Sequence, residues 1–276
     1  MVRLSGWVRV FAATIAGIVM AGTASAASCN RGSFEDWLAD FRQKAGTMGI
    51  SQATLSAALD NLTLDPSVLS HDRGQGVFRQ SFEQFSGRMV SAYRIKHGSA
   101  LIRKYAPIFS KIEEQFGVPA PVVVAIWGLE TDFGANSGNF PTIRSIATLA
   151  YDCRRSPMFT AELIDALRLV DAGDLSPEAM RGAWAGELGQ TQFMPSSYLK
   201  FAVDYEGNGH RDLIHSVPDV LASTANYLRS YGWKRGQPWG EGTDNFNVLL
   251  EWNKSTVYTK TVAYFAQRLA EGSGEQ

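Results

Sequence analysis

Apolar and aromatic residues recur at helical spacing along most of the chain. From Val77 to Tyr105 they return every three or four positions, and the spacing continues from Tyr105 to Phe116. The segment Pro119–Leu129 is apolar at almost every position, as in a helix that is buried on all sides. The same periodicity predicts amphipathic helices over Met158–Val170, Val217–Tyr231 and Ser255–Leu269. Because period-two alternation is hardly visible, we expect a mainly α fold, α+β at most, with no more than a small β-hairpin.

Capping residues predict where several of these helices begin or end. Ser33 and Ser51 are predicted N-caps, and Gly117 is a predicted C-terminal stop. The segment Ser176-Pro177-Glu178 combines an N-cap with a proline at the first helical position, so a further helix is expected to begin there. Pro195-Ser196 predicts one more helix start.

The first 26 residues have the pattern of an export signal. Arg3 and Arg9 are followed by the apolar run Val10–Ala21 and by Ala24-Ser25-Ala26, small residues of the kind that a signal peptidase reads. The run is too short to span a bilayer, and no later segment holds about 18 consecutive apolar residues. We therefore expect removal of residues 1–26 and a soluble periplasmic protein without a transmembrane segment. A retained N-terminal anchor is the alternative.

Composition narrows the function classes. With a formal net charge of -1, the chain has no bulk charge that would favour nucleic acid. Its seven Trp, nine Tyr and 15 Phe suit a carbohydrate cleft, where sugar faces stack on aromatic rings, and suit an ordinary core as well.

The two cysteines, Cys29 and Cys153, both follow the export signal. An oxidising compartment permits a disulfide between them. Lipidation of Cys29 is the weaker alternative, because Ala26-Ala27-Ser28 lacks the leucine that a lipobox usually carries. Two cysteines and four scattered histidines make no zinc-type ligand cluster.

The first segment with candidate chemistry is AIWGLETDFG, at residues 125–134. Glu130 comes at the end of a strongly apolar helix, where its neighbours remove water from its carboxyl. Desolvation raises the pKa of a carboxyl, which a general acid needs near neutral pH. The alternative is a glutamate that simply emerges at a helix end.

The second segment is GELGQTQFMPSSY, at residues 186–198. Its two glycines allow the backbone to pass close to a ligand or to another part of the chain. Its two amides and its aromatic ring suit hydroxyl and N-acetyl groups. Taken alone, a tight loop with ordinary capping explains the segment slightly better.

Together, these two segments resemble the lytic murein transglycosylase B family. The resemblance extends from about Trp37 to Leu269. It implies a lysozyme-like catalytic core, residues 111–276, with an added N-terminal helical lobe, residues 27–110. Its most specific motifs are GLETDFG at 128–134, PTIRSIATLAYD at 141–152, RGAWAGELGQTQFMPSSY at 181–198 and STANYL at 223–228.

The resemblance implies cleavage of the β-1,4 bond between N-acetylmuramic acid and N-acetylglucosamine in peptidoglycan, with a 1,6-anhydromuramic product. Glu130 matches the family's catalytic glutamate, which would protonate the glycosidic oxygen and then accept a proton from the muramyl C6 hydroxyl. One carboxyl serves both steps because the nucleophile belongs to the substrate, unlike the two-carboxylate scheme of most glycosidases. Asp132 and Glu187 are the second candidates, and no cofactor is required.

The resemblance also implies which residues bind the glycan. The family's cleft positions are matched by Gln192, Phe193, Asn226, Tyr227, Asn253 and Tyr258. Trp252 stands where a tyrosine is expected, which keeps a stacking face and changes the polar tip. Ala183 stands where a serine can hydrogen-bond the catalytic glutamate, so that support must come from elsewhere.

A third segment, DYEGNGHRD at residues 204–212, reads like the start of an EF-hand loop. The predicted ligands of a structural Ca²⁺ are Asp204, Glu206, Asn208 and the His210 carbonyl, and the resemblance adds Asp219. The twelfth position is His215, where an EF-hand has a bidentate glutamate. A metal-free polar turn is therefore the alternative.

Two other functions remain open. A hydrolytic muramidase on the same fold would give products that have gained a water molecule. A peptidoglycan-binding protein without catalysis is a different class, against which the presence of Glu130 argues. We expect a monomer that acts on glycan strands.

Overall fold

The computed structural model describes residues 32–74 and 80–273, so the predicted signal peptide and Cys29 lie outside the described residues. Within them the chain forms thirteen helices and one sheet of two strands, which confirms the mainly α prediction. The helices are α1 (Phe34–Thr47), α2 (Gln52–Leu59), α3 (Pro66–Arg73), α4 (Phe82–Met89), α5 (Ala92–Lys104), α6 (Ala106–Phe116), α7 (Ala120–Thr131), α8 (Thr142–Tyr151), α9 (Ser156–Asp171), α10 (Pro195–Phe201), α11 (Val217–Ser230), α12 (Asp244–Trp252) and α13 (Thr256–Ser273). The strands are β1 (Phe140–Pro141) and β2 (Arg181–Gly182).

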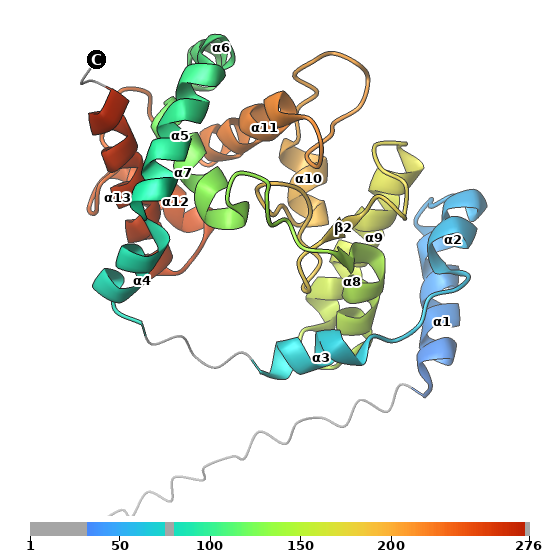
Figure 1. The fold of residues 1–276 in the computed structure, drawn as a ribbon. Helices are drawn as coiled ribbons and strands as arrows, with labels where there is room; N and C mark the ends of the chain where they lie inside the picture. Colours follow the sequence, from blue (N-terminus) through green and yellow to red (C-terminus); the bar gives the residue numbers. More distant parts are fainter. Residues whose placement is uncertain (1–31, 75–79, 274–276) are drawn as a thin grey trace, which may run out of the picture.

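Helix α7 is the centre of one half of the molecule. Ten of its twelve residues are buried, as expected for a helix that is apolar on every side. It packs against α5, α6, α11 and α13, which surround it in Figure 1. The helix that carries Glu130 is therefore held on several sides by neighbouring helices.

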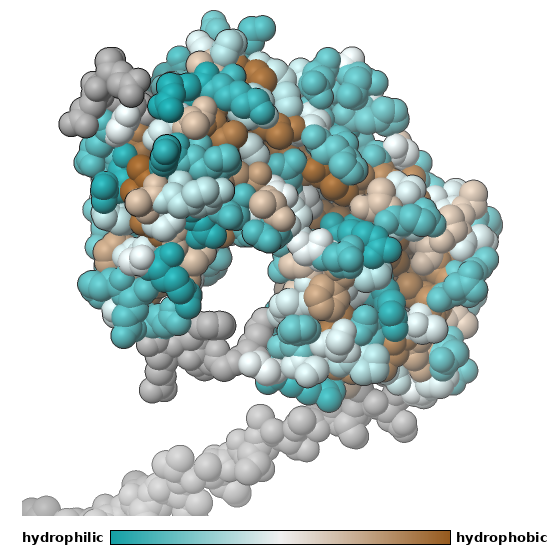
Figure 2. Space-filling view, in the orientation of Figure 1, coloured by the Kyte–Doolittle hydropathy of each residue, from teal (hydrophilic) through white to brown (hydrophobic). Residues whose placement is uncertain are grey.

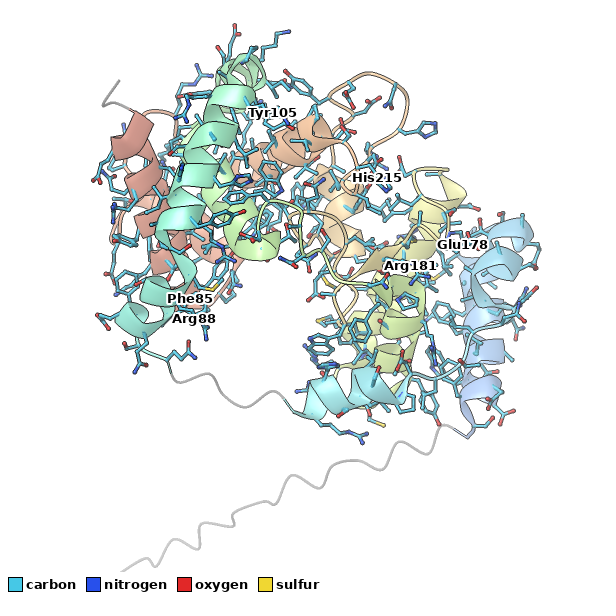
Figure 3. All side chains as sticks on the ribbon, viewed as in Figure 1. Phe85, Arg88, Tyr105, Glu178, Arg181 and His215 are labelled. Atoms are coloured by element: carbon cyan, nitrogen blue, oxygen red, sulfur yellow. The ribbon has the colours of Figure 1, made fainter. Side chains whose placement is uncertain are left out.

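The helices form two regions. The α7 region comprises α4–α7 and α11–α13, and the α9 region comprises α1–α3, α8–α10 and the small sheet (Figure 1). Helix α10 packs against both α9 and α11 and so connects the two regions. The surface is hollowed between them (Figure 2), and the labelled Phe85 on α4 and Arg181 on β2 lie in different regions (Figure 3).

The predicted N-terminal lobe is divided between these two regions. Helices α2 and α3 pack on α9 and α8, whereas α4 and α5 pack on α13 and α7. The contiguous lobe expected for residues 27–110 is therefore not a single packing unit among the described residues. The chain order did not show this, because long-range packing against α8, α9 and α13 decides it.

Several predicted helix ends are confirmed. Ser33 caps α1 in a capping box with Asp36, and Ser51 caps α2 by accepting from the Thr54 amide. Gly117 ends α6 in the left-handed conformation, with φ of 76°. The pattern from Val77 to Tyr105 is broken between α4 and α5, where Ser91 begins a new helix.

The helix predicted to begin at Ser176 is wrong. Ser176 does accept a hydrogen bond from the Ala179 amide, but only a single turn forms. The backbone then forms long-range hydrogen bonds in place of helical ones: the Met180 carbonyl accepts from Thr142 N, and β2 pairs with β1. The sheet is antiparallel, with Phe140 opposite Gly182. Its strands are distant in sequence, so it is not a hairpin, and it stays within the small β content that the sequence allowed.

Candidate active site

Glu130 lies in the last turn of α7, and the helix end is shaped by an unusual run of backbone angles. Asp132, Phe133 and Gly134 all have positive φ, of 54°, 62° and 88°. A Cβ at Gly134 would come within 2.4 Å of the Gln190 side chain, so only glycine fits this close approach. Arg94 Nε donates to Asp132 Oδ1 over 2.9 Å and holds the turn from α5. The position of Glu130 is thus set by a constrained helix end.

Two donors converge on one oxygen of Glu130. Tyr258 Oη donates to Oε1 over 2.5 Å, and Trp252 Nε1 donates to the same atom over 2.9 Å. An oxygen that already accepts two hydrogen bonds is the poorer place for a proton when the carboxyl is in its acid form. When Glu130 is protonated, Oε2 is therefore the oxygen free to carry the acid proton.

Burial is the main cause that raises the pKa of Glu130 above its ordinary value. The hydrogen bonds from Tyr258 and Trp252 lower this pKa, and the negative charge of Glu187 raises it again. Burial also raises the pKa of Tyr258 well above the ordinary tyrosine value, and the Glu130 charge adds to this. Tyr258 is consequently a hydrogen-bond donor at neutral pH. A carboxyl with a raised pKa beside such a donor is suited to proton transfer.

The loop at 182–193 contributes part of the lining of the site. Its backbone is pinned by reciprocal hydrogen bonds between Leu188 and Phe193, of 2.7 and 2.8 Å. Gln190 ties this loop to α7, because its Oε1 accepts from Trp127 Nε1 over 3.0 Å and its backbone carbonyl accepts from the Thr131 hydroxyl. Gln190 thus serves the structure, and the amide that reaches the cleft is that of Gln192.

The resulting cleft has a volume of ≈ 350 Å³. Glu130 lines it together with most of the residues predicted to bind the glycan, namely Gln192, Phe193, Tyr227, Trp252 and Asn253, while Ala183, Glu187, Met194 and Ser197 complete the lining. Gln192 has a φ of 55°, and its Nε2 donates to the carbonyls of Gly189 and Ser137. Phe193 is only 2 % exposed and supports the rings of Tyr227 and Trp252 edge-on.

Three predicted residues lie outside the lining. Asn226 donates from Nδ2 to the Phe201 carbonyl over 2.9 Å, so it fastens α11 to α10. Tyr258 acts on the site through its hydroxyl on Glu130. Asp132 is paired with Arg94, which makes it a poor second candidate for the chemistry.

The support that Ala183 cannot give to Glu130 comes from Trp252. The indole N–H of Trp252 donates to Glu130, so the tryptophan that replaces the expected tyrosine also supplies a hydrogen bond. The sequence showed that Ala183 and Trp252 both depart from the family pattern, but not that one compensates for the other. It also gave no sign that Met194 and Ser197 line the cleft, although both belong to the motif at 181–198.

In the predicted cation loop, the carboxylates accept hydrogen bonds from groups of the loop itself. Asp204 accepts from the amides of Gly207, Asn208 and Gly209, and Glu206 accepts from the Ser216 hydroxyl. Asp219 accepts from the amides of Tyr205 and Asp212. In the described part of the chain, no group of three or more His, Cys, Asp or Glu side chains is placed to hold a metal ion. In this conformation, the loop does not fit an EF-hand ion.

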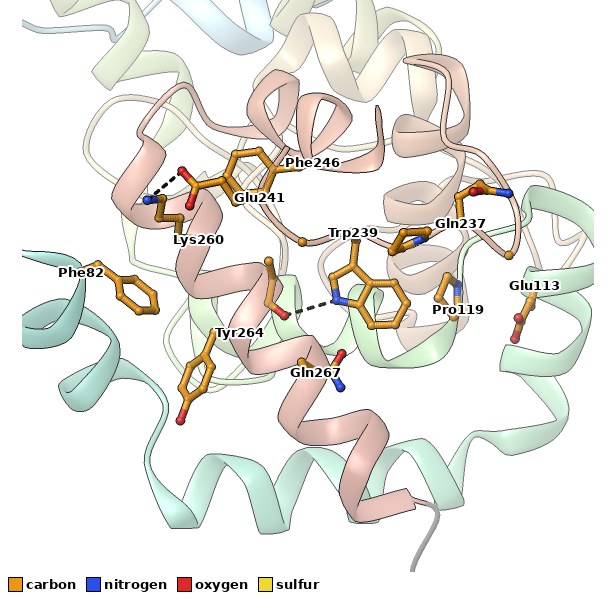
Figure 4. Close-up of a pocket in the computed structure, with 14 residues that line it drawn as sticks. Phe82, Glu113, Pro119, Gln237, Trp239, Glu241, Phe246, Lys260, Tyr264 and Gln267 are labelled. Atoms are coloured by element: carbon orange, nitrogen blue, oxygen red, sulfur yellow. Dashed lines mark hydrogen bonds and ion pairs between the residues drawn. The ribbon is translucent and has the colours of Figure 1, made fainter. Parts of the chain in front are cut away.

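A larger cavity lies away from Glu130. This α13 groove, of ≈ 880 Å³, is lined by Phe82, Glu113, Pro119, the segment 236–241, Phe246, Lys260, Ala263, Tyr264 and Gln267 (Figure 4). Trp239 donates to the Ala263 carbonyl over 3.3 Å, and Lys260 pairs with Glu241. Its carboxyls, Glu113 and Glu241, are both exposed, so the groove lacks the desolvated carboxyl that the cleft has. Size alone therefore does not identify the reactive site.

None of the helices in residues 32–74 and 80–273 is both long enough and apolar enough to cross a bilayer.

Comparison with known proteins places this site in a family. Residues 33–243 match the family model described as the transglycosylase SLT domain. The membrane-bound lytic murein transglycosylase B of Escherichia coli K12 is 32% identical over 154 residues, which are 55% of this chain and 42% of that protein. The match thus spans less than half of that relative's length.

Solved structures agree with this result. SltB3 from Pseudomonas aeruginosa, in complex with NAG-anhNAM-pentapeptide, superimposes with a TM-score of 0.82 at 32% identity, covering 86% of this chain and 80% of SltB3. Escherichia coli Slt35, solved in complex with calcium, gives a TM-score of 0.76 at 25% identity and covers 86% of this chain and 93% of Slt35. The lysozyme-like, mainly helical fold expected from the sequence is confirmed. The matched region carries both cleft segments, and the chain belongs to the transglycosylase SLT domain family.

Proposed function

We propose that the chain is a peptidoglycan lytic transglycosylase that cleaves the β-1,4 bond between N-acetylmuramic acid and N-acetylglucosamine. The observation that carries this is the setting of Glu130: a desolvated carboxyl in a cleft, with both donors on Oε1 and Oε2 left free for the acid proton. The family supports the same reaction, and the SltB3 structure contains an anhydromuramic fragment.

The proposed reaction needs one carboxyl and no water. Glu130 Oε2 gives its proton to the glycosidic oxygen as the bond from muramyl C1 to that oxygen breaks. The muramyl C6 oxygen then bonds to C1, and its proton passes to Glu130, which restores the acid. Tyr258 and Trp252 stabilise the intervening carboxylate through Oε1. Gln192, Tyr227 and Asn253 line the space for the sugars.

Mass spectrometry of the products from purified sacculi tests this proposal. A transglycosylase leaves 1,6-anhydromuramic ends, whose mass is lower by one water than that of the hydrolysis product. Products that carry the added water would assign the cleft to a hydrolytic muramidase. A protein that binds sacculi and releases nothing would be a non-catalytic binder.

The remaining proposals concern the cellular location, the disulfide, the oligomeric state and the metal content of the enzyme. We propose export to the periplasm with cleavage after residue 26, a Cys29–Cys153 disulfide and action as a monomer on glycan strands. Lipid anchoring at Cys29 stays the alternative, and the Escherichia coli relative is itself named membrane-bound. A structural Ca²⁺ at the loop 204–219 is kept as a proposal because Slt35 was solved with calcium. Binding there would require the Asp204 and Asp219 carboxylates to exchange backbone donors for the ion.

A further inference from the structure

Glu187 has a carboxylate oxygen whose burial the proposed reaction does not explain. It lines the same cleft as Glu130. Four side-chain atoms of the described residues are buried without a hydrogen-bond partner, and Glu187 Oε2 is the carboxylate oxygen among them. Buried polar atoms are nearly always hydrogen-bonded, so a carboxylate oxygen inside a cleft that no protein group pairs with is available to a donor on the ligand.

The backbone holds Glu187 in one place. The Glu187 carbonyl accepts from Ala183 N over 3.2 Å, and Gly186 N donates to the Ala183 carbonyl over 3.1 Å. A Cβ at Gly182 would lie 1.7 Å from the Glu187 carbonyl oxygen, so this approach requires glycine. Gly186 also packs closely on Ile146, which anchors the turn to α8. The buried carboxyl is therefore presented by a rigid turn.

The charges around the two carboxyls differ. Burial raises the pKa of Glu187 above its ordinary value, and backbone N–H groups and the positive charge of Arg155 offset only part of this rise. Glu130 faces Tyr258 and Glu187, and the Glu187 charge raises the pKa of Glu130. Tyr227, the other titratable residue of the cleft lining, has a pKa raised by burial and stays neutral. Both pKa values are raised by burial, and the two carboxyls differ in their partners: two side-chain donors at Glu130, and backbone N–H groups and Arg155 at Glu187.

We propose that Glu187 is a further functional residue of this cleft: its Oε2 accepts a hydrogen bond from an N–H or O–H group of the bound glycan, and the negative charge of its carboxyl opposes ionisation of Glu130. Glu187 acts on the reaction through Glu130 and the substrate and transfers no proton to the scissile bond. The proposal rests on the proposed function.

The test is the pH dependence of kcat and KM for Glu187→Gln on solubilised glycan strands. Without the negative charge, the proton leaves Glu130 more easily, so the alkaline limb of the kcat profile moves to lower pH. KM changes little, because the amide oxygen of glutamine can still accept from the glycan. Glu187→Ala shows the same displacement and in addition a KM raised about tenfold, the loss expected for one hydrogen bond to a charged group.

Glu162→Gln is the matched control. Glu162 is also a partly buried glutamate, and burial raises its pKa, but it accepts from the backbone and hydroxyl of Ser196 at the start of α10. This variant is expected to lower the melting temperature and to leave the pH profile unchanged. If the profile of Glu187→Gln coincided with those of the wild type and Glu162→Gln, the inference would be wrong.

Other outcomes separate this inference from the proposed function. A Glu187→Gln variant that is folded, binds glycan and is inactive at every pH would show that Glu187 itself transfers a proton, which overturns the inference. A wild-type protein that yields no anhydro product overturns the proposed function. Normal anhydro products from wild type, together with an unshifted Glu187→Gln profile, overturn only the role of Glu187 and leave the transglycosylase reaction standing.

Discussion

The cleft and the loop 204–219 both contain carboxylates for which the sequence predicted a function, proton transfer in the cleft and cation binding in the loop. The two regions differ in the hydrogen bonds that the carboxylate oxygens make. In the loop, both Asp204 oxygens and both Asp219 oxygens accept backbone amides. In the cleft, one oxygen of Glu130 accepts two side-chain donors, and Glu187 Oε2 has no partner. A carboxylate is available for a ligand or a proton only where at least one of its oxygens is not already used by backbone N–H groups.

Glu130→Gln is expected to have the largest effect. The substitution keeps the shape of the side chain and removes the proton. Since general acid–base catalysis contributes roughly 10²–10⁴-fold per group, and one residue performs both transfers, activity should fall close to zero. Release of anhydromuropeptides from sacculi measures this, and a pull-down on the same sacculi should show retained binding.

Asp132→Asn is the matched control for that variant. It changes a carboxylate two positions away that is paired with Arg94, and asparagine tolerates the left-handed backbone at this position. Most activity should remain. An active Glu130→Gln protein, or an inactive Asp132→Asn protein that is folded, would contradict the assignment of Glu130 as the single acid/base.

Tyr258→Phe should have the next largest effect. It removes the Tyr258 donor from Oε1 and leaves that of Trp252, so the carboxylate formed after the first proton transfer is less stabilised. A hydrogen bond to a charged group is worth about 1.5–3 kcal/mol, which corresponds to a roughly 10–100-fold lower kcat.

The pH profile gives the sign of the Tyr258 effect. This donor lowers the pKa of Glu130, so its removal raises that pKa and moves the alkaline limb to higher pH, opposite to the shift expected for Glu187→Gln. Tyr264→Phe is the control, because Tyr264 lies on the same helix and lines the α13 groove. An alkaline limb that moves to lower pH in Tyr258→Phe would disprove this account of Oε1.

Asp219→Ala should affect stability and leave the chemistry intact. Asp219 is fully buried, and its removal leaves the amides of Tyr205 and Asp212 without acceptors. An unsatisfied buried group costs about 1–3 kcal/mol, so the free energy of unfolding in urea should fall by at least that amount. The kcat of the folded variant should match the wild type. A selective loss of kcat would show that this loop takes part in the reaction.

Calcium should have the smallest effect. If the loop 204–219 can exchange its backbone donors for an ion, millimolar Ca²⁺ raises the melting temperature, by about 2–4 °C per kcal/mol of stabilisation for a chain of this size. The shift should disappear in Asp204→Asn. If calcium left the melting temperature unchanged, the carboxylates of this loop would serve only to hydrogen-bond its own backbone.

The sequence by itself determined most of the helices and singled out Glu130 as the candidate acid. The all-apolar run before Glu130 predicted a buried helix with a desolvated carboxyl at its end, and α7 has both properties. Capping by Ser33, Ser51 and Gly117 was also predictable from the sequence, because a capping residue acts within four residues of the helix end.

Only the tertiary structure decided which side chains meet. The helix predicted at Ser176 was lost to pairing with a strand about forty residues away, and Asn226 was turned toward α10 instead of the cleft. Trp252 and Tyr258 reach Glu130 across more than 120 residues of sequence, and Glu187 is placed beside it by a turn packed on α8. Local propensity governs where a helix begins and ends, whereas hydrogen-bond partners and desolvation depend on contacts that exist only after the helices pack.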